Sequence, residues 1–214
     1  MKNDEYTKQL ENCIEQMIKP LNGVPFNLII KSMSGYEVEF FDHKNKQHKK
    51  VLEILKKVGN QIINKHYDFS GRPNEFGNHI ESFVKKEMNK LNLNADIPTN
   101  SKGKKVSAGY PDIVFNFEQK MYYLECKTFA LKNINDSFRT FYFSPGKHSK
   151  ITAKTIHFLI SFENEKVENG YFIKSYKIIT INSLSCNLKS EFNACNKDLY
   201  SNNRGAITLY DSSK

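Results

Sequence analysis

Two carboxylates and a lysine stand in a pattern that suits metal-assisted chemistry. Asp112 follows Pro111, and Glu125 and Lys127 lie further along the chain with one residue between them. Carboxylates that lie close together repel each other unless a cation sits between them, and Mg²⁺ commonly takes one or two protein carboxylates. Such an ion can generate hydroxide near neutral pH and neutralise charge that develops on a phosphodiester. We expect Lys127 to orient the attacking water or to stabilise the transition state.

The residues around this pattern predict a β-hairpin that brings the three charged side chains together. One face of the hairpin would be apolar and would carry Ile113, Phe115, Phe117, Tyr122, Leu124 and Cys126. If the connecting loop has an even number of residues, Asp112 lies opposite Glu125 and on the same face as Lys127. An odd loop would place Asp112 among apolar side chains, which is costly for a charge. The hydrophobic pattern therefore favours the register that clusters the charges, with the main-chain carbonyl of Cys126 as a further candidate metal ligand.

A solvent-facing arrangement is the alternative. In that case Glu125 and Lys127 form an exposed pair on an edge strand, and Asp112 simply stands where a strand begins. Asp, Glu and Lys are all depleted in strands, so their convergence at one end of the hairpin favours a functional site.

The two halves of the pattern resemble the motif of the PD-(D/E)XK nuclease superfamily, and most of all its small type II restriction endonucleases. Pro111-Asp112 precedes a hydrophobic strand, and Glu125-Cys126-Lys127 ends the next strand. The resemblance covers about residues 75–163. It implies that Asp112 and Glu125 bind one or two Mg²⁺ ions and that Lys127 is the catalytic lysine.

The same resemblance implies a glutamate on the helix before the hairpin. Glu81 fits best, because it borders the expected buried stripe near Val84. A solvated helix glutamate is the other interpretation of Glu81. Glu75 stands at the start of the same helix, where its charge could instead compensate the helix dipole.

Hydrophobic periodicity predicts the elements that must position these residues. The expected helices span about residues 4–18, 47–66 and 74–93, the last with Asn74 as its N-cap. The expected strands span about residues 27–30, 36–40, 112–117, 121–128, 140–143, 156–162, 170–181 and 206–210, the last within a polar, irregular tail that starts at 183. This order predicts an α/β (mixed α+β) fold in which a central mixed β-sheet is flanked by helices, as in a restriction-endonuclease-like core. We expect a single nuclease domain over residues 1–214, with helices in 4–66 available for dimerisation or DNA clamping.

Composition points to a folded, basic protein. The chain has 214 residues and a net charge of +9, and almost all of its positive charge comes from lysine. A basic surface suits a polyanionic partner such as DNA, although a surplus of lysine can also serve solubility. The cysteines show no disulfide or zinc spacing. The sequence has no long apolar run and begins with polar residues, so we expect no membrane span and a cytoplasmic location.

Several polar residues near the motif are candidates for DNA contact. They are Lys104, Lys105, Arg139, Ser144, Lys147, Asn193 and Asn196. Arg139 is the first choice for base recognition, because arginine bound to guanine is the commonest specific contact in the major groove. A solvated loop at Lys104 and Lys105, a core strand after Arg139 and turn structure at the two asparagines are the structural alternatives.

The function that these observations favour is a Mg²⁺-dependent, sequence-specific double-stranded DNA endonuclease of the restriction type. A homodimer would match a palindromic site and cut both strands, and such an enzyme implies a cognate DNA methyltransferase genetically. One alternative is a structure-specific repair or recombination nuclease on the same fold. A second is a non-catalytic nucleic-acid-binding module, which the intact set of Asp112, Glu125 and Lys127 argues against.

Overall fold

A computed structural model describes residues 2–65, 73–135, 142–144, 146, 148–167 and 170–189, with the main chain alone described at 2–3 and 73–78. The chain divides into two compact units, one formed by Pro25–Ser185 and the other by Met1–Val24 together with Cys186–Lys214. Among the described residues, no helix is long and apolar enough to cross a membrane.

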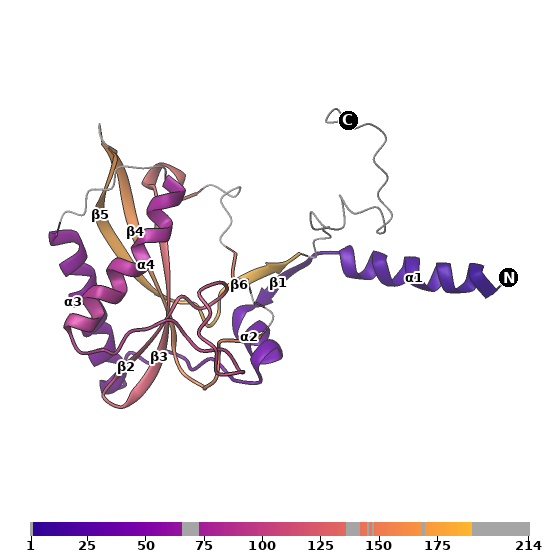
Figure 1. Cartoon of the computed structure of the whole chain (residues 1–214), viewed down its shortest axis with the longest axis horizontal. Coiled ribbons are helices and arrows are strands. Elements are labelled where there is room, and N and C mark those ends of the chain that lie inside the picture. The colour runs from indigo at the N-terminus through magenta and orange to yellow at the C-terminus, as the bar shows by residue number, and fades with distance from the viewer. Residues whose placement is uncertain are drawn as a thin grey trace, which may run out of the picture. The chain divides into compact units, whose positions relative to one another are not determined.

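From α3 to β3, two helices and then two strands follow one another in the order that the periodicity predicts (Figure 1). The helices are α1 (Lys2–Ile18), α2 (Phe26–Ser34), α3 (Lys46–Asn64) and α4 (Pro73–Lys90), with a short 3-10 helix at Leu131–Asn133. The strands are β1 (Leu21–Pro25), β2 (Ile113–Phe117), β3 (Lys120–Phe129), β4 (His157–Val167), β5 (Gly170–Thr180) and β6 (Ser185–Leu188). The expected helices at 4–18, 47–66 and 74–93 and the expected strands around the motif are confirmed, with ends that differ by a few residues.

Four strands form one mixed sheet in the larger unit, in the order β2-β3-β4-β5. The β2–β3 and β4–β5 pairs are antiparallel, whereas β3 and β4 run parallel. A parallel pair needs a crossover connection, which the chain supplies between Phe129 and His157. The expected α/β class, with a central mixed sheet flanked by helices, is therefore confirmed.

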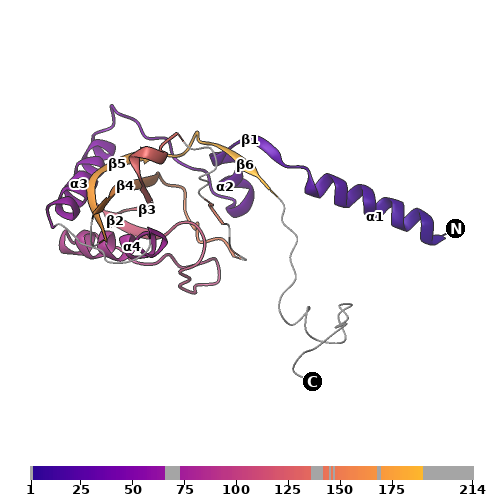
Figure 2. The ribbon, with the colours of Figure 1, turned by 90° about the horizontal axis from the view of Figure 1, so that it is seen from above.

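The core lies between one face of this sheet and helices α3 and α4. Figure 2 shows these two helices beside the strands, and their buried side chains join those of the sheet in one apolar cluster. That cluster includes Val51, Leu55, Val58, Ile62, Ile80, Val84, Met88, Ile113, Phe115, Tyr122, Leu124, Cys126, Phe158, Ile160 and Phe162. Burying each large apolar side chain contributes roughly 1.5–3 kcal/mol, so this face determines how the strands are oriented.

The hairpin turn between β2 and β3 sets the register of the site. Glu118 and Gln119 are its two central residues, and both have positive φ, at 47° and 62°. Such a turn matches the twist of antiparallel strands. The loop is even, and Ile113 pairs with Leu124. The predicted register is thus confirmed, because the next position along the ladder sets Asp112 opposite Glu125.

The hairpin expected at 27–30 and 36–40 is wrong, because residues 26–34 form helix α2. Phe26 and Ile30 lie one helical turn apart and are both buried, and Gly35 ends the helix in the left-handed conformation with φ 80°. The apolar run is short enough to suit either a strand or a helix. Only Val38 in the second segment makes a β-bridge among the described residues, to Thr155.

Three smaller expectations also need correction. Asn74 is not an N-cap, since α4 already begins at Pro73, a residue whose fixed φ suits the first helical turn. Residues 142 and 143 form no strand, and the tail that was expected to be irregular contains β6. Strand β6 pairs with β1 in a separate two-stranded sheet. Positions 140–141 and the expected strand at 206–210 lie outside the described residues.

We predict that Gly59→Ala destabilises the fold although alanine favours helices by about 1 kcal/mol over glycine. A Cβ at Gly59 of α3 would lie 2.5 Å from the Tyr176 ring on β5. Overpacking of this kind costs about 1–3 kcal/mol, to be measured as a lower free energy of urea unfolding. Lys57→Ala, at an exposed position of the same helix, is the control. If Gly59→Ala were as stable as the wild type or more stable, the Tyr176 ring would move aside without a loss of stability, and the prediction would be wrong.

Candidate active site

The predicted cluster lies at the open end of the β2–β3 hairpin. Asp112 stands just before β2, where its Oδ2 accepts a hydrogen bond of 2.8 Å from the main-chain N–H of Cys126. On the same face of β3, the Lys127 ammonium donates to Glu125 Oε1. The structure thus brings Asp112, Glu125 and Lys127 together on the face that looks away from the core.

Glu125 is a buried carboxylate whose charge and hydrogen-bonding capacity are only partly satisfied by its neighbours. Its side chain is 3% exposed, and Oε2 has no hydrogen-bond partner among the described residues. Burial first, and the charge of Asp112 second, raise the pKa of Glu125 from its ordinary value of 4.5 to about 7, against the lowering effect of Lys127. Leaving a buried charged oxygen unpaired is expensive. A cation bound by Glu125 and Asp112 would remove this cost, so the residues fit a metal ion.

The main chain of Cys126 faces the same position. Tyr123 directs its N–H toward the β4 side, to the carbonyl of Ile156 at 3.3 Å. Main-chain groups of successive residues point to opposite edges of a strand. Cys126, three residues after Tyr123, therefore directs both its N–H and its carbonyl toward β2. Because β2 begins only at Ile113, the Cys126 carbonyl looks toward Asp112 rather than into a continuous ladder. This orientation suits the expected role of a main-chain metal ligand.

Glu81 on α4 also belongs to the cluster. Burial and then the charge of Asp112 raise its pKa, whereas the ammonium groups of Lys127 and Lys150 lower it. Glu81 thus interacts electrostatically with Asp112 and with both lysines, and its part in the chemistry stays a prediction. The side chain of Glu75 lies outside the described residues.

Lys150 is a member of this site that the sequence analysis missed. The residue is 2% exposed, and its ammonium donates to the Ser107 carbonyl at 3.3 Å. Burial lowers the pKa of Lys150, whereas the charges of Asp112, Glu125 and Glu81 raise it. No sequence signal could have identified Lys150, because it lies in an irregular connection far from the motif and reaches the cluster only through tertiary packing.

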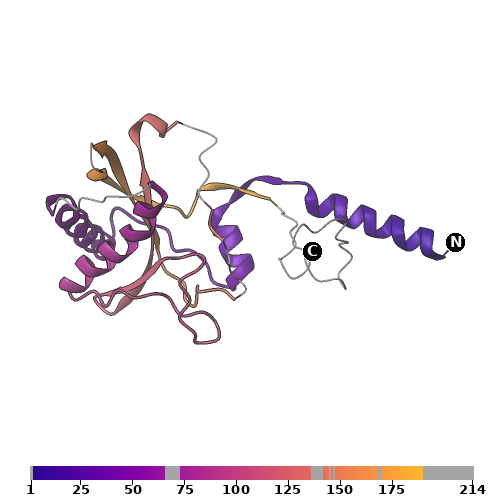
Figure 3. The same ribbon diagram turned by 45° about the horizontal axis from the view of Figure 1, so that its top comes forward.

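A second missed feature holds the segment that carries Asp112. The hydroxyl of Tyr110 and Nδ1 of His157 lie 2.7 Å apart in a hydrogen bond, and both residues are buried. Burial lowers the pKa of His157 to about 3, so the imidazole is neutral. Phe26 packs edge-on against both rings. Figure 3 shows the helix of Phe26, α2, on the side of the sheet away from α3.

The candidate DNA-contacting residues are only partly described. The main-chain carbonyl of Ser144 accepts a 2.8 Å hydrogen bond from Tyr110 N–H, so its exposed side chain stands near the segment that leads to Asp112. Lys104 is exposed, and Lys105 is exposed but forms an ion pair with Asp96. The remaining candidates, Arg139, Lys147, Asn193 and Asn196, lie outside the described residues.

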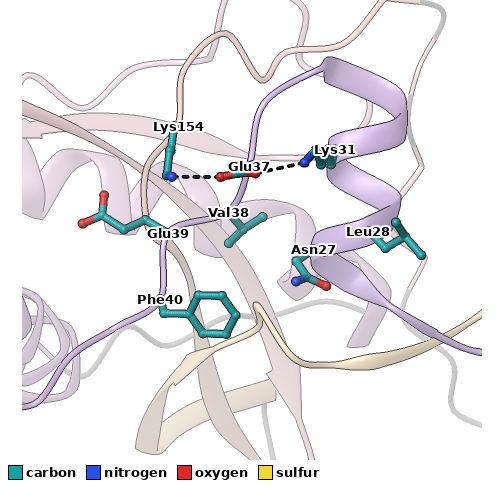
Figure 4. Close-up of a pocket in the computed structure, with 8 residues that line it drawn as sticks. All are labelled: Asn27, Leu28, Lys31, Glu37, Val38, Glu39, Phe40 and Lys154. Carbon is teal, nitrogen blue, oxygen red and sulfur yellow. Dashed lines mark hydrogen bonds and ion pairs between the residues drawn. The ribbon is translucent and has the colours of Figure 1, made fainter.

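A hollow of about 560 Å³ lies elsewhere in the larger unit (Figure 4). Its lining residues come from α2, from the segment 37–40 and from Lys154, and none belongs to the cluster. Glu37 bridges Lys31 at 2.9 Å and Lys154 at 2.8 Å. These two lysines lower the pKa of Glu37 to about 2. Glu37 and the two lysines in the lining of this hollow therefore neutralise one another. The cluster of Asp112, Glu125 and Lys127 remains the better candidate for an active site.

The cluster offers fewer side-chain ligands than a site in which the protein supplies the whole coordination sphere of a metal ion. Within the described residues, no group of three or more His, Cys, Asp and Glu side chains is placed to hold a metal ion. Mg²⁺ nevertheless keeps several of its waters and commonly takes one or two carboxylates together with substrate phosphate. Two close carboxylates, a main-chain carbonyl and neighbouring ammonium groups suit the hydrolysis of a phosphodiester.

The fold and the site together define a class of protein. A mixed four-stranded sheet flanked by helices, with acidic residues and a lysine at the end of a central hairpin, is consistent with a restriction-endonuclease-like core. Comparison with known families agrees, since residues 20–203 match the model of the type II restriction enzyme MjaV family. The type II restriction enzyme MjaV of Methanocaldococcus jannaschii is 36% identical over 219 aligned residues, which cover 94% of this chain and 95% of that protein. The chain belongs to the MjaV family of type II restriction enzymes.

We predict that the metal-free protein loses stability as the pH rises from about 4.5 to about 7. Folded Glu125, with a pKa of about 7, holds a proton over this range that the unfolded chain has released. The folded state therefore binds more protons, and its stability falls with rising pH. Urea unfolding in EDTA should show this slope in the wild type and a smaller one in Glu125→Gln. Identical slopes would mean that Glu125 ionises normally.

Proposed function

We propose that the protein is a Mg²⁺-dependent endonuclease that cleaves double-stranded DNA at a specific sequence. The observation that carries the proposal is the buried Oε2 of Glu125, which lies beside Asp112 and has no hydrogen-bond partner among the described residues. The membership of the chain in the MjaV family supports the same proposal. This arrangement follows the PD-(D/E)XK pattern, which we propose as the motif of residues 111–127. The catalytic core would span about residues 75–163.

Asp112, Glu125 and the Cys126 carbonyl would hold one or two Mg²⁺ ions. The ion would supply a nucleophile near neutral pH and neutralise charge on the phosphate. Lys127, whose ammonium contacts Glu125, would orient the attacking water or stabilise the transition state. Glu81 would complete the acidic side of the site. Its raised pKa favours proton uptake more than that of an ordinary glutamate does, so it is suited to act in proton transfer.

The substrate proposal rests on the family and on charge. The MjaV protein is named a type II restriction enzyme, and a net charge of +9 favours binding to a phosphate backbone. Lys104, Ser144 and the segment around Arg139 and Lys147 adjoin the motif in sequence or structure and are candidates for DNA contact. We propose a homodimer, because a twofold-symmetric pair of sites would cut both strands of a palindrome. A cognate methyltransferase would then protect the host DNA.

Removal of single catalytic groups is expected to slow or abolish cleavage and to spare the fold. We predict that Lys127→Ala lowers the rate of DNA cleavage by about 10²–10³-fold, as loss of a transition-state contact does, and that Asp112→Ala removes the products altogether. The measurement is cleavage of plasmid DNA in Mg²⁺, with the fragment ends mapped. Lys56→Ala removes an equal charge from an exposed position on α3 and serves as the control.

The fragment pattern separates the alternatives. Discrete fragments with a common end sequence support restriction activity, whereas a random smear would overturn sequence specificity. Cleavage at branched structures, regardless of sequence, would point to a repair or recombination nuclease. No cleavage of any DNA, with binding retained, would leave a nucleic-acid-binding module.

Metal binding itself should raise the stability of the protein. A ligand present at a hundred times its Kd stabilises the folded state by about 2.7 kcal/mol. We predict that Mg²⁺ raises the unfolding temperature of the wild type in the absence of DNA and that Asp112→Asn removes most of this increase. The increase should be unchanged in Lys154→Ala, whose ammonium pairs with Glu37. A gain that survives Asp112→Asn would place the ion elsewhere.

A further inference from the structure

Lys150 is a buried cation at the candidate active site to which the proposed function gives no role. The residue is 2% exposed, whereas lysine is almost never fully buried unless it is paired. Its ammonium donates to the Ser107 carbonyl at 3.3 Å and, among the described residues, forms an ion pair with no carboxylate. An ammonium group has three N–H donors. Two donors of Lys150 therefore lack a protein acceptor within the described part of the chain.

The segment around Lys150 is fixed on the face of β3 that carries the site. The main-chain N–H of Thr152 donates to the Tyr123 hydroxyl at 2.8 Å. Side chains of alternate residues share a face of a strand, so the Tyr123 ring lies on the same face of β3 as the carboxylate and the lysine of the motif. On the other side of Lys150, the Ser149 carbonyl accepts a 2.9 Å hydrogen bond from the N–H of Ser101. Contacts on both sides therefore hold Lys150 in place, and its ammonium is not needed for this.

Lys150 differs from Lys127 in how it interacts with the carboxylates. The Lys127 ammonium contacts Glu125 directly. Lys150 interacts with the carboxylates of the site only through electrostatic effects without contact, and these carboxylates are Asp112, Glu125 and Glu81. They raise the pKa of Lys150, but burial lowers it by more, and the net shift is downward. The carboxylates therefore compensate the charge of Lys150 incompletely, whereas a structural counter-ion would be expected to contact one of them.

The site would carry an excess of positive charge once a metal ion is bound. Its three carboxylates face the ammonium groups of Lys127 and Lys150, and one Mg²⁺ would add two positive charges. With all three carboxylates ionised, one positive charge is left over, and a single phosphodiester group would balance it. The metal ion offers no acceptor to the free donors of Lys150, because it is itself a cation. A phosphate oxygen is an acceptor that forms strong hydrogen bonds with an ammonium group.

We infer that Lys150 is a second catalytic lysine, whose ammonium donates to a non-bridging oxygen of the phosphate that is cleaved. The inference rests on the proposed function, which brings a phosphodiester group to Asp112 and Glu125. Asp112 and Lys127 are only partly buried, so the phosphate would enter from their side and meet Lys150 behind the metal ion. The contact would strengthen as negative charge builds up on the phosphate during attack, and Lys150 would thus stabilise the transition state.

Inorganic phosphate tests this role without DNA. In the full-length wild type with Mg²⁺, phosphate should raise the unfolding temperature above that in sodium chloride of equal ionic strength, because a bound ligand stabilises the folded state. Lys150→Met should keep the increase that Mg²⁺ causes alone. It should bind phosphate about 10–100-fold more weakly, as loss of a hydrogen bond to a charged group does, and so lose most of the phosphate increase.

Two further variants serve as controls. Lys154→Met makes the same change at an exposed lysine that pairs with Glu37, and it should keep both increases. Lys150→Arg should retain part of the phosphate increase, because a guanidinium group also donates to phosphate. Replacement of a buried, incompletely paired charge by an apolar side chain of similar volume is often neutral or stabilising, so Lys150→Met is expected to fold. If it does not unfold cooperatively, Lys150→Gln takes its place with the same expectations.

The outcomes separate phosphate binding from a structural role. If the phosphate increase is absent in the wild type or unchanged in Lys150→Met, the inference is overturned. Loss of both the Mg²⁺ and the phosphate increase in Lys150→Met would also overturn it, since the ammonium would then act by holding the acidic cluster together. No measurement here uses cleavage. A protein that binds phosphate through Lys150 but cuts no DNA would therefore contradict the proposed nuclease activity alone.

Discussion

The antiparallel pairing of β2 with β3 is the constraint on which the site depends. Its two-residue turn at Glu118 and Gln119 makes the loop even, and side chains alternate between the faces of a strand. One register therefore buries the apolar residues against α3 and α4 and at the same time turns Asp112, Glu125 and Lys127 to the other face. A shift by one residue would exchange the two faces, so the stability of the core and the assembly of the site rest on the same pairing.

The site stores unfavourable charge that the rest of the larger unit has to stabilise. Glu125 is almost fully buried next to Asp112, and the ammonium groups of Lys127 and Lys150 offset part of the repulsion. Buried charges that are incompletely paired destabilise a fold. The apolar cluster on the far face of the sheet supplies the stability that permits this arrangement. A bound cation would relieve the remaining imbalance, which links metal binding to folding through the same oxygen atoms.

Sequence patterns predicted the parts of the fold that have a clear period. The long stripe of α3 and the alternation in β2 and β3 were predictable because each extends over enough residues to exclude other structures. Helix α2 was not, since its short apolar run fits a strand equally well, and the burial of Phe26 and Ile30 is what favours the helix. In the site, the family resemblance and the place of Glu81 beside a buried stripe predicted a role for this glutamate, and the structure adds its electrostatic interaction with Asp112. Lys150 was missed because a loop lysine carries no such signal.

By itself, the sequence determined the register of the β2–β3 hairpin that brings Asp112, Glu125 and Lys127 together. The order of apolar and charged residues from Pro111 to Lys127 leaves one arrangement that avoids a buried, isolated Asp112. The tertiary structure alone decided which distant groups join it, because contacts across a sheet depend on packing and not on spacing along the chain. Lys150 enters beneath the loop at Ser107, and His157 anchors Tyr110 from the neighbouring parallel strand. Neither contact follows from local sequence, since a crossover connection between β3 and β4 brings the partners together.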